Sequence, residues 1–221
     1  MTSFPGSPRL LKGGIVLIDL VSGAVLRIIT LQYNPDSLSR TLQVQGVGAE
    51  GGDRSEALRL KAPPIETFKL EAELDVTDQL EKPTEGQNQM AAQLGLHPVL
   101  AALETILYPT SARLLANNSL AQAGTLEIAP MLAPLTLFVW SEVRILPVRI
   151  TELSITEEAF DQNLNPIRAR VSLGMRVLNV NDLGFDNKGG DLYMTYQKGK
   201  ERLAAQAQAG TFGALGIGGI P

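Results

Sequence analysis

Cysteine is absent from the 221 residues, and histidine and tryptophan each occur once. Without cysteine the chain forms no disulfide bond and offers no thiolate metal ligand or cysteine nucleophile. The single histidine, His97, precedes Pro98 at a predicted helix start, and catalysis or metal binding there would need partner residues. We expect His97 to cap or pack the start of that helix. We expect Trp140 to anchor the core or its rim at a strand end.

Charged residues and long apolar runs are also scarce. Charged residues make up 19% of the chain, against about 25% in typical domains. The net charge of −4 argues against nucleic-acid binding, although a local basic stripe at 168–176 stays possible. No apolar run approaches the ~18 residues of a membrane span. The first residues lack the charged and apolar regions of a secretory signal, so we expect synthesis in the cytoplasm and no membrane insertion.

Sequence patterns that indicate catalysis are missing too. The motif Gly-x-Ser-x-Gly is absent, and the glycines at 46–48 and 189–190 do not join a strand to a helix as a phosphate-binding loop does. The paired carboxylates Glu157-Glu158 and Glu71/Glu73 favour a solvated or interface face over an acid–base pair. We therefore predict that the chain is not an enzyme and holds no cofactor or metal.

The clearest pattern that is present is a strand from Ile167 to Val177. Every second residue is apolar, and three of the positions between them are arginines: Arg168, Arg170 and Arg176. A period of two is imposed by a strand with one buried face. Strands are also predicted at Leu135–Trp140 and Val143–Ile155, and segment 161–166 has the Asn, Asp and Pro of a turn. Together these segments predict a β-meander.

The first third of the chain predicts further strands. Apolar runs at 14–20 and 24–33 flank Ser22-Gly23 and predict a hairpin. The segment Gln45–Ser55, with its four glycines, predicts a loop. After Pro63-Pro64, residues 67–76 alternate again, with apolar side chains on one face and mostly charged side chains, including Glu71 and Glu73, on the other.

One helix is predicted with a clear amphipathic stripe, from Pro98 to Leu107. Residues 77–96 are ambiguous, and 112–126 predict a loop with a helical turn. Towards the end of the chain, 181–190 predict a linker, 192–209 a helix and 210–221 a Gly-rich tail too short to build its own core.

The arginine-bearing strand has three interpretations: a solvated face, a nucleic-acid stripe, or an interface with acidic strands of a neighbouring copy. The acidic face at 71–75 and the negative net charge favour the interface. A long strand with an unpaired edge also invites pairing. The candidate inter-subunit residues are Arg168, Arg170, Val171, Leu173, Arg176, Glu71 and Glu73.

Four segments in order resemble the tube-type proteins of contractile injection systems. They are Leu31–Arg40, Gly95–Pro98 leading into Leu100–Pro109, Pro134–Trp140, and Phe160–Leu173. The resemblance covers about residues 12–180. It is nearest to the tube initiator, or baseplate hub adaptor, of phage tails and phage-tail-like particles.

The resemblance implies a mainly β (α+β) fold, namely a split antiparallel β-barrel over 14–180 with one packed helix. From their composition, the Pro-, Gly- and Ser-rich residues 1–13 are expected to form a flexible arm before it, and 181–221 a short helical tail after it. The resemblance also implies a homohexameric ring that joins the hub or spike protein to the inner tube protein and templates tube assembly. Sheath or other baseplate adaptor proteins are further possible partners, and nucleic acid is not one.

Two alternatives stay open. Members of this branch often continue into a peptidoglycan-binding LysM module, for which 191–221 is too short and too Gly-rich. A degenerate LysM-like tail could still make the chain a cell-wall adaptor. Alternatively, the chain could be a monomeric barrel with a small molecule in an apolar pocket lined by Trp140. The resemblance leaves open whether the particle stays in the cytoplasm, is membrane-anchored or is released.

Overall fold

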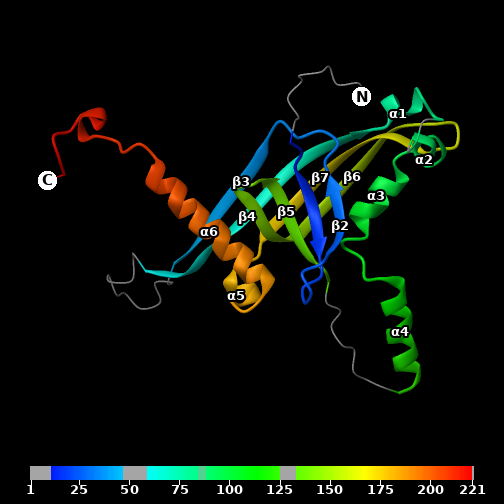
Figure 1. Ribbon diagram of the computed structural model, residues 1–221, viewed down its shortest axis with the longest axis horizontal. Helices are drawn as coiled ribbons and strands as arrows, with labels where there is room; N and C mark the ends of the chain where they lie inside the picture. Colours follow the sequence, from blue (N-terminus) through cyan, green and yellow to red (C-terminus); the bar gives the residue numbers. More distant parts are fainter. Residues whose placement is uncertain (1–10, 47–58, 85, 87, 125–132, 221) are drawn as a thin grey trace.

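The computed structural model describes residues 11–46, 59–84, 86, 88–124 and 133–220. Within these ranges seven strands form one antiparallel sheet in the order β2-β1-β5-β6-β7-β4-β3, and helices lie around it (Figure 1). The strands are β1 Gly14–Ile18, β2 Val25–Thr30, β3 Leu38–Gly46, β4 Leu60–Asp75, β5 Leu135–Ser141, β6 Arg144–Phe160 and β7 Pro166–Val177. The helices are α1 Thr77–Leu80, α2 Asn88–Leu94, α3 His97–Glu104, α4 Ser111–Gln122, α5 Val180–Leu183 and α6 Lys188–Gln206, with a 3-10 turn, η2, at Phe212–Leu215.

The predicted fold class is confirmed at its coarser level, a mainly β protein with a few helices. The sheet is open, because the strands at its two ends, β2 and β3, do not pair with each other. The barrel itself is therefore not confirmed.

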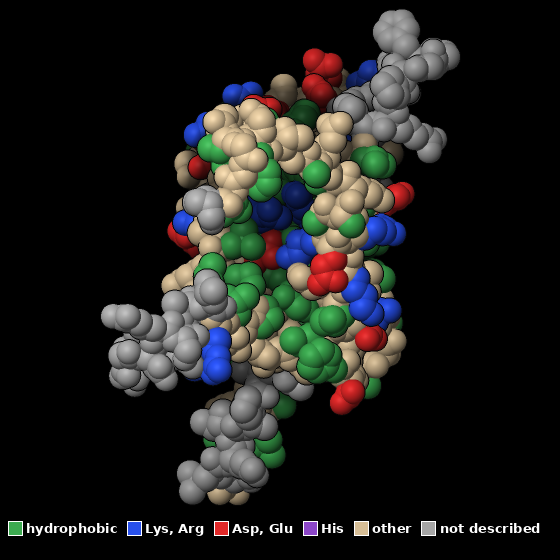
Figure 2. All heavy atoms as spheres, turned by 90° about the vertical axis from the view of Figure 1, so that its left-hand side faces the viewer, with side chains coloured by type: hydrophobic (Ala, Val, Ile, Leu, Met, Phe, Trp, Pro, Cys, Tyr) green, Lys and Arg blue, Asp and Glu red, His purple; other side chains and the backbone are tan. Residues whose placement is uncertain are grey.

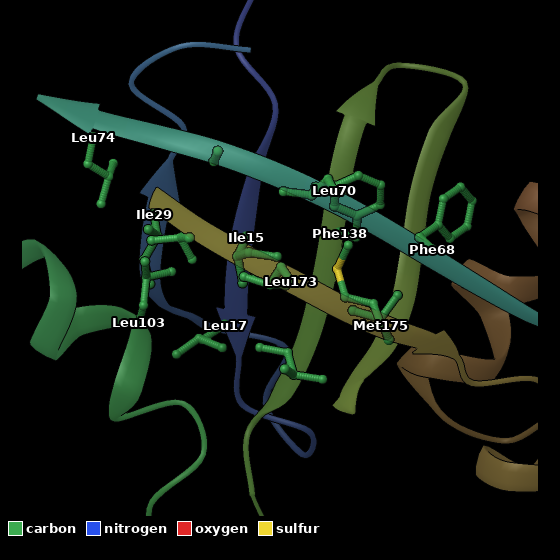
Figure 3. Close-up of a cluster of buried hydrophobic side chains, with 14 of the residues drawn as sticks. Ile15, Leu17, Ile29, Phe68, Leu70, Leu74, Leu103, Phe138, Leu173 and Met175 are labelled. Atoms are coloured by element: carbon green, nitrogen blue, oxygen red, sulfur yellow. The ribbon is translucent and has the colours of Figure 1, made fainter. Parts of the chain in front are cut away.

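The core lies on one face of the sheet, where the half that contains β1 and β5 approaches the half that contains β7 and β4 (Figure 3). Phe68 of β4 and Phe138 of β5 are fully buried, with ring centroids 5.6 Å apart, although β4 and β5 are three positions apart in the sheet. Helix α3 adds Leu100 and Leu103 to this core, and α6 adds Tyr193 and Tyr196. The C-terminal helix is thus part of the main body.

The predicted alternation of β7 and β4 is confirmed. The apolar residues Ala169, Val171, Leu173, Met175 and Val177 are all buried, and Arg168 and Arg170 are exposed on the opposite face. In β4 the same division separates Phe68, Leu70, Ala72 and Leu74 from Lys69, Glu71 and Glu73. The predicted hairpin of β1 and β2 is also present, with somewhat shorter strands.

Several boundaries differ from the prediction. Strand β4 begins at Leu60 and runs through Pro63 and Pro64, which were expected to precede it. The prolines are tolerated because β4 pairs there only with β3, in an irregular register, and meets β7 only from Thr67 onward. Strand β6 extends to Phe160, and β3 was not predicted at all. The predicted loop Gln45–Ser55 lies mostly outside the described residues.

Two helical segments also correct the prediction. The expected loop at 112–126 holds α4, a helix of 12 residues. The expected linker 181–190 holds α5 and the first turn of α6, which the side chain of Asn187 caps by accepting a hydrogen bond from the Gly190 amide. A Cβ atom on Gly189 would lie 2.6 Å from a methyl of Leu183, so glycine permits the close contact of the two helices.

Hydrogen bonds to the backbone hold the segments 31–40, 95–98 and 160–173 in place. Asn34 accepts from the Gly13 amide at 2.9 Å and donates to the Leu11 carbonyl at 2.7 Å. Gln32 accepts from the Asp75 amide at 2.8 Å, which ties the chain after β2 to the end of β4. The Leu96 amide donates to the Pro166 carbonyl at 2.9 Å and fixes α3 against the β6–β7 turn.

Candidate functional site

The most distinctive surface is the face of β3, β4, β7 and β6 that points away from the core. The register places no apolar side chain on this polar face over Ser39–Gln43, Thr67–Asp75, Arg168–Arg176 and Arg149–Glu158. Just outside these ranges, Ile65 lies opposite Gln43 at the margin of the polar face. Five basic and five acidic residues lie on it: Lys69, Arg149, Arg168, Arg170, Arg176, Glu71, Glu73, Asp75, Glu152 and Glu158. The polar face is therefore hydrophilic and balanced in charge.

Ion pairs cross the strands of the polar face. Arg170 of β7 lies between Glu73 of β4 at 3.9 Å and Glu158 of β6 at 3.7 Å. Lys69 of β4 reaches Glu152 of β6 at 3.9 Å over the position of Gly174, which has no side chain to separate them. These pairs are exposed, so they contribute little to stability and instead fix the register of the strands.

Asp75 and Arg168 form the closest of the cross-strand pairs, with 2.8 Å between Oδ2 and Nη2. Partial burial of Asp75 acts to raise the pKa of its carboxyl, but hydrogen bonds from Thr77 and from Arg168 outweigh it and lower the pKa below its ordinary value. The hydrogen bond and the charge of Asp75 raise the pKa of Arg168 in turn. Both groups are thus held in their charged forms.

The expectation that β7 pairs with a neighbouring copy is wrong. Strand β7 lies inside the sheet and pairs with β6 on one side and β4 on the other. The acidic strand that complements its arginines is β4 of the same chain. Val171 and Leu173 are also not interface residues, since they are 1% and 3% exposed in the core. For Arg168, Arg170, Arg176, Glu71 and Glu73, which lie on the polar face, an inter-subunit role stays a prediction.

The free strand edges lie elsewhere in the sheet. Among the described strands, β3 pairs only with β4, so its other edge is open. Strand β6 pairs with β5 only as far as Val148, and beyond it no described strand takes the place of β5. Residues 149–160 of β6 thus form a second open edge, and the outer edge of β2 is a third. The alternation Leu38, Arg40, Leu42, Val44 was the signal that could have revealed β3.

On the core side, a buried carboxylate fastens α6 to the β3–β4 hairpin. Glu66 is 3% exposed and accepts a hydrogen bond of 2.9 Å from the Tyr196 hydroxyl. Lys200 and Arg40 lie 3.5 and 3.7 Å from its oxygens. Burial and the bond to Glu66 raise the pKa of Tyr196 to about 12. From the side on which α6 and this hairpin lie, the molecule is hollowed and charged side chains gather inside (Figure 2).

Two concave regions are present besides this hollow. One is an apolar gap of about 20 Å³ between β1, β4 and α3, about the size of one water molecule, and Trp140 does not line it. The other is a polar niche of about 330 Å³ on the polar face, lined by the turn 33–37 and by Glu71, Glu73 and Arg170. Neither has the apolar walls and the volume of a typical small-molecule site.

The two residue types that occur once in the chain, tryptophan and histidine, differ in their burial. Trp140 is half-buried against the core, 5.9 Å from the Phe138 ring, which confirms it as a rim anchor. His97 is exposed, and the N-cap of α3 is Leu96 with no side-chain cap, so the expected capping or packing role of His97 is wrong. Among the described residues there is no cluster of His, Asp and Glu that could hold a metal ion.

No helix in the described part of the chain is long and apolar enough to cross a membrane. Residues 181–220 contain helices and turns but no strand. Models of known protein families give no match to this chain, and a comparison with curated proteins gives none either.

Proposed function

We propose that the protein is a structural ring component of a contractile injection system, placed between the baseplate hub or spike and the inner tube. Copies of the chain join through the open edges of β3 and β6, and the polar face lines the lumen of the ring. The resemblance of the four sequence segments motivates this function, and the polar face is the observation that carries it.

The polar face fits a water-filled channel. A sheet face with so few apolar side chains gains little by packing on another protein surface, because little apolar area is removed from water. Strand β6, with 17 residues, is roughly 55 Å long at about 3.3 Å per residue. A lumen lined by such strands is hydrated. Because its positive and negative charges balance, no strong electrostatic field acts on material that passes through it.

The number of strands supports closure of a ring. Four strands (β3, β4, β7 and β6) form the polar face, and each is antiparallel to the next. With an even number, β3 of one copy and β6 of the next run in opposite directions. Repeating this contact gives a continuous antiparallel barrel in which the edges of β3 and β6 are paired, and such a heterologous contact is the kind from which rings are built. The predicted barrel is thus a property of the assembly.

The side chains of the two edges match in one antiparallel register. If Leu42 of β3 lies opposite Ile155 of β6 in the next copy, Val44 faces Leu153 and Arg40 faces Glu157. Apart from Val44, which lies at an irregularity of β3, these residues are placed by the register on the core side of their strands. On the polar face, Thr41 then faces Thr156 and Gln43 faces Ser154. Apolar, charged and polar residues each meet their own kind of partner.

Electron microscopy of the purified chain, alone and with the inner tube protein, tests this function. We expect rings of constant diameter with an open lumen, which seed tube growth. A protein that stays monomeric at high concentration and does not bind the end of the tube would contradict the proposal.

A further inference from the structure

Two apolar surfaces of the described chain remain without a partner. The first is α4, a helix of 12 residues with no buried residue, on which Leu114 and Leu115 are 50% and 67% exposed. It projects away from the sheet (Figure 1). Isolated helices of ~12–15 residues or fewer are marginal in water, so α4 is expected to need a surface to pack on.

The second surface is the outer face of β2, β1 and β5, opposite the core. The register places Val25 and Ile28 of β2 on this outer face, and they are 58% and 63% exposed. Val16 of β1 and Val139 of β5 continue the surface and are half-buried. An exposed apolar strip of this kind on an end strand marks an interaction site.

A helix already covers the other half of the same face. Ile18, Leu135 and Leu137 are buried there, and Leu183 of α5 and Leu192 of α6 pack against them. The face therefore has the shape and the apolar character that accept a helix. The exposed strip carries no charged side chain, and α4 carries only Arg113, so their contact requires no charge to be buried.

We propose that α4 of one copy docks on the outer face of β2 and β1 of a second copy, beside α5. Each chain offers one helix and one strip, so the contact is heterologous, like the one between the strand edges. This contact rests on residues separate from β3 and β6, and it does not depend on the proposed function.

Because the chain has no cysteine, only introduced cysteines can form a disulfide bond, so a cross-linking test identifies the residues in contact. One full-length protein carries Leu115→Cys and a second carries Ile28→Cys, and the two are mixed under mild oxidation. We expect a covalent dimer with one copy of each variant and little dimer from either protein alone. A matched control, Asn117→Cys, lies on the opposite side of α4 and should cross-link several-fold less.

Three outcomes would overturn the proposal. The first is a mixture that gives no mixed dimer. The second is a dimer of the Leu115→Cys protein with itself, since α4 would then meet α4. The third is an intramolecular disulfide in a chain that carries both substitutions, since α4 would then pack on its own sheet. If rings still form in these cases, the proposed function stands while the α4 contact does not.

Discussion

Asp75 at the end of β4 and Arg168 of β7 face each other across the sheet, and the Nε and Nη2 atoms of Arg168 lie 2.9 and 2.8 Å from the same Asp75 oxygen. This pair lies at one end of the polar face. It joins the two strands whose opposite charges the sequence displays, and it does so within one chain.

The Asp75 pair predicts a loss of stability in acid. The pKa of Asp75 is lowered from its ordinary value of about 3.8, so its contribution is present above that pH and lost as pH falls below it. Arg168→Met should lower the urea midpoint by a constant amount above pH 5, and the difference from the unmodified protein should shrink below pH 3.8. The same change at the exposed Arg202 should have no such effect. A difference that is independent of pH between 2 and 6 would contradict the role of Asp75.

Tyr196 predicts a corresponding loss in alkali. Its pKa is raised to about 12 from 10, so its contribution is present below pH 10 and lost as pH rises to about 12. Tyr196→Phe should lower the free energy of unfolding by about 1–2 kcal/mol at pH 7, because Glu66 loses a buried donor. The variant should lose less further stability between pH 10 and 12. Denaturant unfolding followed by circular dichroism measures both, and equal alkaline losses in the two proteins would exclude this role.

Gly95 predicts a specific cost at the junction of α2 and α3. Its φ is +56°, and a Cβ atom there would lie 2.5 Å from the Pro166 carbonyl oxygen, which accepts from the Leu96 amide. Gly95→Ala should destabilise the protein by about 2 kcal/mol or more, through backbone strain and displacement of the β6–β7 turn. Gly23 is the matched control, with φ +69° and nothing near its Cβ position. Equal losses for Gly95→Ala and Gly23→Ala would show that the contact with Pro166 costs nothing.

The sequence predicted the strands that are buried on one side only. In β7 and β4, burial of one face makes apolar and polar residues alternate, and this alternation is recognisable in the sequence alone. Strand β3 was not predicted because Arg40 interrupts the alternation of the apolar residues Leu38, Leu42 and Val44. Helix α4 was not predicted because its leucines, at positions 114, 115 and 120, do not recur at the three- and four-residue spacing of an amphipathic stripe.

What the sequence could not supply was the partner of each strand. The acidic face of β4 and the arginines of β7 are complementary in any arrangement that brings them together, in one chain or in two. Only the order of the strands places β7 inside the sheet and β3 at its end, and only the short pairing of β6 with β5 leaves the rest of the β6 edge open. The candidate inter-subunit contact therefore lies at those two edges and not at β7.

The open edge of β3 predicts that one added charge blocks assembly. Val44 is 68% exposed, so Val44→Asp should leave the fold intact and change the free energy of unfolding by no more than about 0.5 kcal/mol. In the ring it would place a carboxylate against Leu153 of the next copy, and ring formation should fall at least tenfold. The control Val21→Asp, at a position 96% exposed in the β1–β2 turn, should assemble normally. Light scattering after size-exclusion chromatography measures both, and normal assembly of Val44→Asp would rule out this edge.

The register of the ring contact is tested most directly by a pair of cysteines in the cysteine-free chain. Residues 41 and 156 are exposed and face each other between copies in the proposed register, within the ~4.5–5.5 Å Cβ separation of directly opposed residues. The chain with Thr41→Cys and Thr156→Cys should form a ladder of covalent oligomers under mild oxidation, ending at the size of the ring. The chain with Thr41→Cys and Glu152→Cys, four residues out of register, should not. A ladder from the second chain only, or from neither, would contradict the account.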